Sequence, residues 1–417
     1  MGTFKNLILI RIAKPFLRAL YFFMKLGPAC NRAVFISRQG DEPSVDYEEL
    51  AKALRAKGFE TEMYLSRQEK DNARFMAEAA ANLRAIMRQM KALAGARVAV
   101  TDGYSIPVSI LKHRKTLTVI QVWHAIGAVK KFGLQTVPSM SEGERQRADM
   151  LNMHRGYDYF VAPSRATARF FAEAFGMDEG RALITGTPSL DALAKETLIK
   201  YVSPDSPMDL VHIAGKKRRD TGGITRLFSE DRRQIGGEGA RHRFNQCFPK
   251  GEAGSADSAR ERAASYPGIA GNDAEGRPSK VVLYVPTYRK AARADARTGE
   301  NTPEERGGAA LRDALGADGY VVIERKHPID EGEDAPSPEC SAEELMRRAD
   351  VVVTDYSSLA ITAALLGKPL YFYIYDIEEY RGSPGLNIDP EEEYGKYAAR
   401  DAAALARLIE ANDYDYA

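Results

Sequence analysis

Short apolar runs alternate with helical patterns along most of this 417-residue chain. Neighbouring parallel strands need a crossover connection of a dozen or more residues, which is usually a helix. The alternation therefore predicts parallel sheets with helices on both faces, and the chain is long enough for two such domains. The expected strands are Ala33–Ser37, Arg97–Thr101, Leu117–Trp123, Tyr157–Ala162, Ala182–Thr185, Val281–Pro286, Tyr320–Glu324, Val351–Thr354 and Leu370–Tyr375.

Helical periodicity fills the segments between these strands, and several of the helices end at a glycine, which favours a helix C-terminus. The expected helices are Asp46–Lys57, Gln68–Leu93, Thr167–Phe175, Ala309–Leu315, Ser341–Arg348 and Leu359–Leu366. We predict an N-terminal Rossmann-like domain over 33–200 and a C-terminal one over 280–417. Between them, residues 203–279 are rich in Gly, Arg, Ser, Asp and Ala, which predicts a disordered or loosely folded insertion. Docking of its basic clusters on anionic lipid is the alternative.

The first 32 residues carry basic charges only, because no Asp or Glu precedes Asp41. A helix opened by Pro15 would form an apolar face between basic flanks, and no apolar run is long enough to cross a bilayer. We predict that residues 1–32 form an amphipathic helix on an anionic membrane surface. The alternative is a helix docked on the protein's own core. The expected face contains Phe16, Leu17, Leu20, Tyr21, Phe23 and Met24, flanked by Lys14, Arg18 and Lys25.

Composition excludes several classes of function. Lys and Arg number 59 against 58 Asp and Glu, so the net charge of +1 argues against nucleic acid as a partner. The three cysteines are scattered and form neither a metal-type pair nor a disulfide framework. The sequence also lacks a phosphate-binding Gly-x-x-x-x-Gly-Lys loop and the Gly-x-Ser-x-Gly elbow of hydrolases. We therefore expect a reaction that needs no metal and no cofactor.

The best catalytic candidate is His124, which directly follows an expected strand. Ligands of open parallel sheets bind beyond the carboxyl ends of the strands, and a histidine there can take a proton near neutral pH. Gly127 would let the backbone approach a ligand closely, and Lys130 and Lys131 could hold phosphate. A structural histidine is the alternative interpretation.

Three further segments lie at carboxyl ends of expected strands. His327, within Arg325–Pro328, could face His124 across a cleft between the domains. Arg289, which ends Pro286–Arg289, could clamp a phosphate. An ordinary loop histidine is the alternative for His327.

The third segment, Thr354–Leu359, links a buried strand to a helix. Ser357 would cap that helix, and the N–H groups behind it form a ready phosphate site. Capping alone would explain one serine, whereas Ser357 and Ser358 together, with Thr354 before them, suit a diphosphate.

Taken together, these motifs resemble the CDP-glycerol glycerophosphotransferase family of wall teichoic acid synthesis. The form WHAxGAxKKFG is more similar to the glycerol-phosphate primase branch than to the polymerases. The resemblance covers most of the chain outside 203–279, in the order that the family has. The matching segments are Gln121–Gly133, Gly186–Asp191, Val282–Arg289, Lys326–Pro328 and Ala349–Tyr380.

The resemblance implies a GT-B fold, which is an α/β architecture of two Rossmann-like lobes with a cleft between them. It implies CDP-glycerol as donor and a polyprenyl-diphosphate-linked sugar as acceptor, at the cytoplasmic face of the membrane. His124 then matches the proposed base, and His327 and Ser357 match groups near the donor diphosphate. Glu379 is expected to hold the ribose, by analogy with other GT-B enzymes.

The chain departs from the family pattern in three places. Ser189 stands where an arginine is usual, the insertion is long, and the tail after Tyr394 lacks a Pro-Gly-Pro. Two other functions therefore stay open. One is a GT-B transferase that uses another CDP-polyol or a nucleotide sugar for a capsule or wall glycan. The other is a degenerate, non-enzymatic assembly partner at the membrane.

Overall fold

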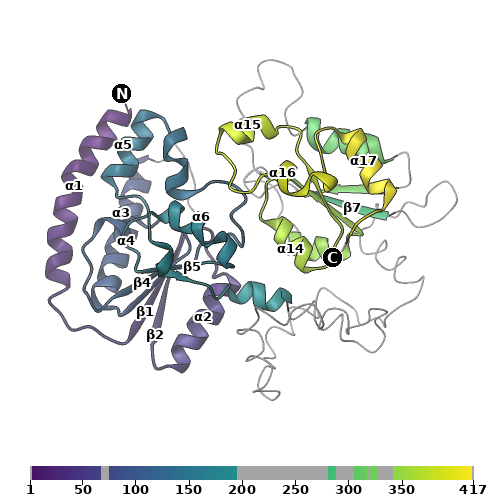
Figure 1. The fold of residues 1–417 in the computed structure, drawn as a ribbon. Coiled ribbons are helices and arrows are strands. Elements are labelled where there is room, and N and C mark those ends of the chain that lie inside the picture. The colour runs from purple at the N-terminus through teal and green to yellow at the C-terminus, as the bar shows by residue number, and fades with distance from the viewer. Residues whose placement is uncertain are drawn as a thin grey trace.

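The computed structural model describes residues 2–66, 75–194, 280–287, 305–316, 320–325 and 341–415. Two parallel sheets organise these residues (Figure 1). The first has six strands in the order β2-β1-β3-β4-β5-β6, and each adjacent pair is parallel. Its strands are β1 (Arg32–Ser37), β2 (Glu60–Leu65), β3 (Val98–Thr101), β4 (Thr118–Gln121), β5 (Tyr159–Val161) and β6 (Ala182–Leu183).

The second sheet has five strands in the order β11-β10-β9-β7-β8, again parallel throughout. Its strands are β7 (Lys280–Val285), β8 (Tyr320–Glu324), β9 (Val351–Thr354), β10 (Leu370–Tyr373) and β11 (Ala398–Ala399). All four residues of β9 and of β10 are buried, as expected for strands with helices on both faces. The prediction of two parallel sheets is thereby confirmed, while the exact domain limits 33–200 and 280–417 stay predictions.

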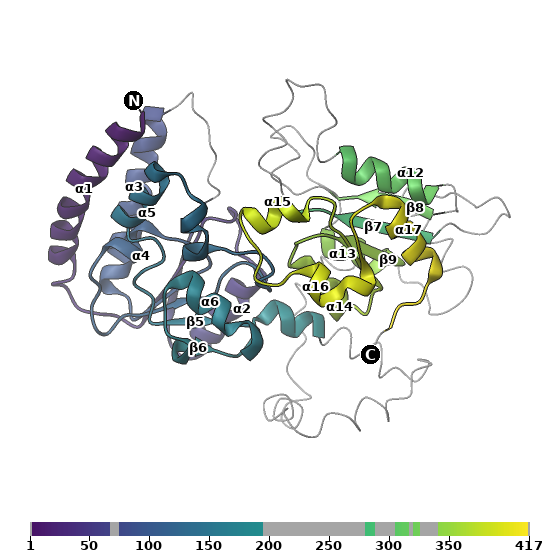
Figure 2. The same ribbon diagram turned by 45° about the horizontal axis from the view of Figure 1, so that its top comes forward.

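Helices cover both faces of each sheet (Figures 1 and 2). Several begin at a capping side chain, for example Ser44, whose hydroxyl accepts the Tyr47 N–H, and Ser164, whose hydroxyl accepts the Thr167 N–H. They are α1 (Gly2–Met24), α2 (Val45–Ala56), α3 (Phe75–Gly95), α4 (Ile106–Ile110), α5 (Glu142–Met150), α6 (Arg165–Phe175), α12 (Ala310–Gly316), α13 (Ala342–Arg348), α14 (Leu359–Leu365), α15 (Ile377–Gly382), α16 (Pro390–Tyr394) and α17 (Ala402–Ala411). Short turns of helix add η2 (Gly133–Ser139), η3 (Glu179–Arg181), η5 (Glu305–Ala309) and η6 (Gly395–Tyr397).

Strand β2 was not predicted, because Glu60–Leu65 lies at the edge of the sheet and mixes charged, polar and apolar residues instead of forming an apolar run. Pro15 lies inside α1 and does not open it, so that expectation was wrong. The ring of a proline is compatible with helical φ and removes one hydrogen bond, a loss that the packing of α1 on α3 and α5 compensates. The predicted insertion 203–279 lies outside the described residues.

Helix α1 has two different sides. Leu17 and Tyr21 are buried in the core that α3 shares with the first sheet, so on this side the docked alternative is correct. The expected basic flanks also point to the protein, since Lys14 Nζ donates to the Met150 carbonyl (2.6 Å) and Arg18 Nε to that of Ile110 (2.8 Å).

The other side of α1 is apolar and exposed, with exposed fractions of 66% for Ile12, 68% for Phe16 and 65% for Phe23. Both views place this helix on the flank of the first half that faces away from the second sheet (Figures 1 and 2). Within the described residues, no helix combines the length and the apolar character needed to span a bilayer.

The split of α1 predicts opposite outcomes for two neighbouring aromatic residues. Tyr21→Ala should lower the free energy of unfolding by about 3 kcal/mol, because it leaves a cavity and removes the hydroxyl that contacts His113 Nδ1 at 2.8 Å. Phe23→Ala, the matched control on the exposed side, should change it by less than about 0.5 kcal/mol. Urea unfolding measures both. Equal losses would mean that both sides of α1 are packed.

Candidate active site

His124 lies just beyond the carboxyl end of β4, as predicted. The turn that presents it is fixed by Gln121, which is fully buried. Its side-chain oxygen accepts the Trp123 N–H (2.9 Å), and its side-chain nitrogen donates to the Gly103 carbonyl (3.0 Å). Trp123 has a φ of 59°, in the left-handed region that a bulky residue rarely adopts. Such strain persists only where the surroundings hold it, and it is concentrated at functional sites.

One ring nitrogen of His124 is occupied and the other is not. Nδ1 lies 2.9 Å from the Asp102 carbonyl oxygen. A carbonyl can only accept, so the proton is on Nδ1 and the lone pair is on Nε2. Gln39 Nε2 lies 3.2 Å from the same Nδ1, and because both atoms carry hydrogens this contact is packing and not a hydrogen bond. Among the described residues no hydrogen-bond partner of Nε2 occurs, which leaves that atom available as a base.

The pKa of His124 is lowered from its ordinary value. The main cause is desolvation by the surrounding protein, opposed by the Asp102 carbonyl, and the positive charge of Lys130 adds to the lowering. The side chain still keeps access to solvent, so a substrate can reach it. A histidine with a lowered pKa is neutral at physiological pH and can accept a proton.

Asp102 connects His124 to the neighbouring strand β3. Its carboxyl group is buried, and desolvation raises its pKa to about 6. Among the described residues, its Oδ1 has no hydrogen-bond partner. The backbone oxygen of the same residue orients His124, so one residue carries both a positioning carbonyl and a perturbed carboxyl group at the site.

An aromatic cluster supports the back of the site. The Trp123 ring stacks on Phe132 with centroids 4.7 Å apart, and it lies 4.2 Å from the His124 ring. His154 packs edge-on against Trp123 at 5.8 Å. It is buried, and desolvation lowers its pKa to about 4. His154 is therefore a neutral packing residue, whereas His124 is the exposed histidine of the cluster.

The loop after His124 crosses to the second sheet. A Cβ added to Gly127 would overlap Ile361 Cδ1 and lie 3.5 Å from Ser358 Cβ. We expected Gly127 to admit a ligand, but the start of α14 occupies that side of the backbone. Ile126 and Val129 complete this crossing by packing into the core of the second sheet. The loop that follows His124 therefore contacts the Ser357–Ser358 turn, and the two were predicted from distant parts of the sequence.

The segment between α15 and α16, residues 383–389, binds the same loop, and we call it the strap. The Asn387 N–H donates to the Val129 carbonyl (2.8 Å), and the Lys131 N–H donates to the Gly385 carbonyl (2.9 Å). The Asn387 side chain also donates to the Lys130 carbonyl (3.1 Å) and lies 2.8 Å from Gln135 Nε2. These contacts fix the backbone of Lys130 and Lys131, the two predicted phosphate ligands.

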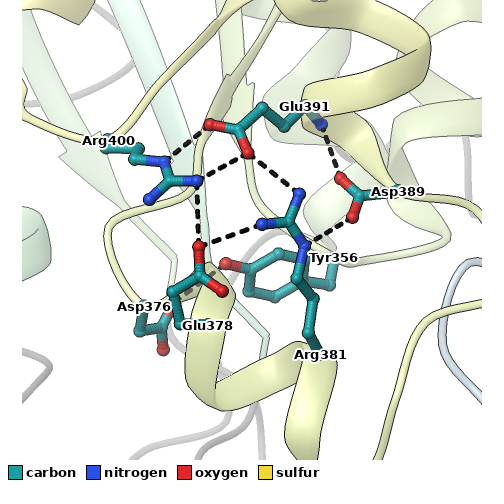
Figure 3. A network of polar contacts seen from close by, with 7 residues as sticks. All are labelled: Tyr356, Asp376, Glu378, Arg381, Asp389, Glu391 and Arg400. Carbon is teal, nitrogen blue, oxygen red and sulfur yellow. Dashed lines mark hydrogen bonds and ion pairs between the residues drawn. The ribbon is translucent and has the colours of Figure 1, made fainter.

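A network of ion pairs holds this strap in place (Figure 3). Arg381 Nε contacts Asp389 at 2.8 Å, and Arg381 Nη2 contacts Glu391 at 2.9 Å. Arg400 holds both oxygens of Glu391, at 2.6 and 2.7 Å, and lowers the pKa of that carboxyl group to about 2. Because Arg381 ends α15 and Glu391 begins α16, the network ties together the two helices that flank the strap.

The remaining residues predicted to bind the donor differ in whether their side chains are free to contact a ligand. The Thr354 hydroxyl is buried and donates to the Val285 carbonyl (2.8 Å), so we leave it out of the donor-binding set. The N-cap of α14 is Ser358, without a side-chain cap bond, and Ser357 Oγ accepts the Leu359 N–H at 3.3 Å. Glu379 is exposed on α15. Arg289 and His327 lie outside the described residues, so their roles stay predictions.

Sequence reasoning missed Gln39, Asp102 and Asn387. Asp102 and Gln39 follow β3 and β1 closely, so their position at a carboxyl edge could have indicated them. Asn387 carries no such signal, because its role comes from the packing of two distant segments. Within the described ranges, no cluster of three or more His, Cys, Asp or Glu side chains could hold a metal ion.

The family described as CDP-glycerol:poly(glycerophosphate) glycerophosphotransferase matches residues 20–204 and 272–417. The teichoic acid ribitol-phosphate primase of Bacillus spizizenii is 27% identical over 69% of this chain and 59% of its own length. The teichoic acid glycerol-phosphate primase of Bacillus subtilis is 24% identical over 70% of this chain and 58% of its own length. The chain thus matches less than two thirds of these curated relatives.

Among solved structures, a histidine-to-alanine variant of the wall teichoic acid polymerase TagF has a TM-score of 0.53 at 19% sequence identity. The match covers 98% of this chain and 86% of that one. The likeness confirms the predicted GT-B arrangement of two Rossmann-like lobes.

The buried, neutral His154 makes a prediction about acid stability. The unfolded chain binds its proton below about pH 6.5, whereas the folded chain does so only near pH 4, so this residue costs stability as pH falls between those values. His154→Asn, which tolerates the residue's φ of 54°, should gain about 3 kcal/mol relative to the parent between pH 6.5 and 4. Asp102 acts in the opposite direction, but it is present in both proteins and cancels. Urea unfolding at the two pH values tests this, and a pH-independent difference would contradict it.

Proposed function

This chain belongs to the CDP-glycerol:poly(glycerophosphate) glycerophosphotransferase family, and on that premise we propose that it transfers glycerol phosphate from CDP-glycerol. The acceptor is a hydroxyl of a polyprenyl-diphosphate-linked sugar, and CMP is released. The product would enter teichoic acid or a related cell-surface glycopolymer. The observation that carries this proposal is His124, an exposed and neutral histidine held at a strand end by the Asp102 carbonyl, on a loop that contacts the start of α14.

In the proposed step the acceptor hydroxyl oxygen attacks the glycerol-bearing phosphorus. That phosphorus forms a bond to the acceptor oxygen and loses its bond to the bridging oxygen, which leaves with CMP. His124 Nε2 takes the hydroxyl proton. The positive charge that results on the ring is stabilised by the Asp102 carbonyl, towards which the Nδ1–H points. Proton transfer of this kind contributes roughly 10²- to 10⁴-fold to the rate.

The donor diphosphate would lie at the rim of the contact between the His124 loop and the start of α14. Lys130 acts electrostatically on His124, and Lys131 follows it on the strap-bound backbone. Ser357 and Ser358 begin α14 on the other side of Gly127. The predicted ligands Arg289 and His327 would complete this side, and Glu379 on α15 would hold the ribose. Phosphoryl transfer depends mainly on such positioning and on charge stabilisation.

A second donor, CDP-ribitol, is favoured by one specific observation: the ribitol-phosphate primase is 27% identical to this chain, against 24% for the glycerol-phosphate primase of B. subtilis. Both donors share the CDP group, so the described residues do not separate them. Protection against heat unfolding by CDP-glycerol, CDP-ribitol and nucleotide sugars would rank the donors. Binding of none of them would favour a non-enzymatic assembly partner.

The exposed side of α1 supports attachment to the cytoplasmic face of a membrane. Phe16 and Phe23 together offer two aromatic side chains that water surrounds, on the flank remote from the second lobe. Burying each in lipid would gain roughly 1.5–3 kcal/mol. The cations Lys14 and Arg18, which we expected at the lipid surface, instead bind backbone carbonyls through their amino and guanidinium groups. We therefore propose that apolar contact contributes most of the attachment.

Removal of the base is the direct test of the mechanism. His124→Ala should reduce CMP release from CDP-glycerol and a lipid-linked disaccharide by about 10³-fold, because no other described group replaces Nε2. His113→Gln is the matched control: it removes an imidazole of the same lobe that bonds Tyr21 and the Val108 carbonyl, away from the strand edge of the site. Rates are normalised to the folded fraction. Near-normal CMP release by His124→Ala would refute its role as base.

Membrane attachment is tested on the exposed side of α1. Phe16→Glu combined with Phe23→Glu should weaken co-sedimentation with phosphatidylglycerol vesicles at least about tenfold, because two carboxylates replace two apolar groups. Val45→Glu on α2 is the control, since Val45 is also exposed but belongs to the helix on the opposite face of the first sheet. Unchanged sedimentation of the double variant would exclude α1 as the attachment surface.

A further inference from the structure

Arg38 follows β1 directly, at the same sheet edge as His124. The turn that carries it is fixed, because Ser37 Oγ accepts the Gln39 N–H (3.1 Å). Gln39 in turn contacts the His124 ring at 3.2 Å. The strand order β1-β3-β4 therefore places Arg38, Asp102 and His124 at the ends of three consecutive strands.

The guanidinium group of Arg38 is half-buried, yet within the described part of the chain no carboxylate or hydrogen-bond acceptor contacts it. Other arginines of the structure differ: Arg32 pairs with Glu60 and Glu62, and Arg381 has three acidic partners. Desolvation lowers the pKa of Arg38, and the hydroxyl of Tyr104 is the group that acts on it electrostatically. A desolvated cation without an anion is costly, and a charged ligand would remove that cost.

A pocket lies beside Tyr104, the residue whose hydroxyl acts on Arg38. Tyr104, which follows β3, lines a cavity of about 210 Å³ together with Met140, Leu151 and Met153. Arg147 of α5 contributes a second cation to its wall. Helix α5 also packs against α1, and a second cavity of about 330 Å³ lies between Met150 and the basic side chains of α1. Glu144 adds one carboxylate to the wall of the first cavity. The two cavities thus lie on either side of α5, one against Tyr104 and the other against α1.

We propose that Arg38 binds the diphosphate of the acceptor, with the pocket beside Tyr104 receiving the first part of its lipid chain. This inference rests on the proposed function, and it deepens it by assigning the acceptor side of the site. The chemistry fits, because a guanidinium binds phosphate oxygens through two parallel hydrogen bonds.

The spacing fits as well. Two strand spacings separate the ends of β1 and β4, which is about 10 Å. An acceptor whose hydroxyl is at His124 and whose diphosphate is at Arg38 would bridge that separation with its sugar. The donor anion is on the other side, where Lys130 is the cation that acts on His124. The two diphosphates thus bind to different cations and do not compete for one.

The test pairs two substitutions with two acceptors. Arg38→Ala and Arg38→Lys are compared with Arg97→Ala, which removes the same charge from an exposed residue at the opposite edge of the sheet. One acceptor is a short-chain prenyl-diphosphate disaccharide, and the other is the same disaccharide on a neutral alkyl chain. CMP release gives KM for each acceptor and for CDP-glycerol.

Arg38→Ala should raise KM for the diphosphate acceptor roughly tenfold to hundredfold, the usual value of a charge-assisted pair. KM for the neutral acceptor and for CDP-glycerol should stay within about twofold, Arg38→Lys should recover part of the loss, and Arg97→Ala should behave as the parent. Equal losses with both acceptors, or a matching rise in KM for CDP-glycerol, would overturn the assignment.

Calorimetric titration with geranyl diphosphate separates this inference from the proposed function. If the parent chain transfers glycerol phosphate and Arg38→Ala binds and uses the diphosphate acceptor normally, the inference alone fails. If the parent transfers no polyol phosphate from any CDP-alcohol but binds geranyl diphosphate about tenfold more tightly than Arg38→Ala, the proposed function fails and the anion site stands. If the parent does not bind geranyl diphosphate at all, the inference is wrong.

Discussion

The site depends on one loop, the segment after His124, which connects the core of the first sheet to the core of the second. The segment that begins at His124 leaves the first sheet, inserts Ile126 and Val129 into the core of the second, and is clasped there by the Asn387 backbone. Gly127 lies at the closest point, where an added Cβ would overlap the tip of the Ile361 side chain and make that side chain move. This single loop therefore determines both the position of the base and its separation from the start of α14. The ion pairs of Arg381 and Arg400 with Glu391 connect α15 to α16 and so hold the strap that binds this loop (Figure 3).

The polar chemistry of the site follows from the same geometry. Desolvation keeps His124 neutral, while the Asp102 carbonyl decides which ring nitrogen carries the proton. The cations near the site come from different segments: Lys130 and Lys131 belong to the loop that crosses to the second lobe, whereas Arg38 follows β1 in the first. A transferase that joins two anionic substrates needs such a division, because two diphosphates bound side by side would repel each other.

The sequence predicts the elements well where a pattern is local. Apolar runs in the sequence predict β1, β7 and β9, and helical periodicity ended by a glycine predicts α2 and α6. The role of His124 is predicted from its position directly after an apolar strand. Contacts between distant segments are not predictable in this way. The hydrogen bonds of Asn387 and the close approach of Gly127 to Ile361 depend on how two sheets meet. That Arg38 has no acceptor among the described residues depends on the packing around the end of β1. The docked and exposed sides of α1 could not be told apart from the sequence either, because Leu17 and Phe16 are adjacent and both apolar, although only Leu17 is buried.

The central claim is that this site moves a polyol phosphate as one unit onto an acceptor hydroxyl. Mass spectrometry of a lipid-linked disaccharide, after incubation with the full chain and CDP-glycerol, measures this directly. We expect an acceptor heavier by one glycerol phosphate, with one CMP formed for each unit added. CMP formed without any gain in acceptor mass, or an acceptor heavier by a sugar, would contradict it.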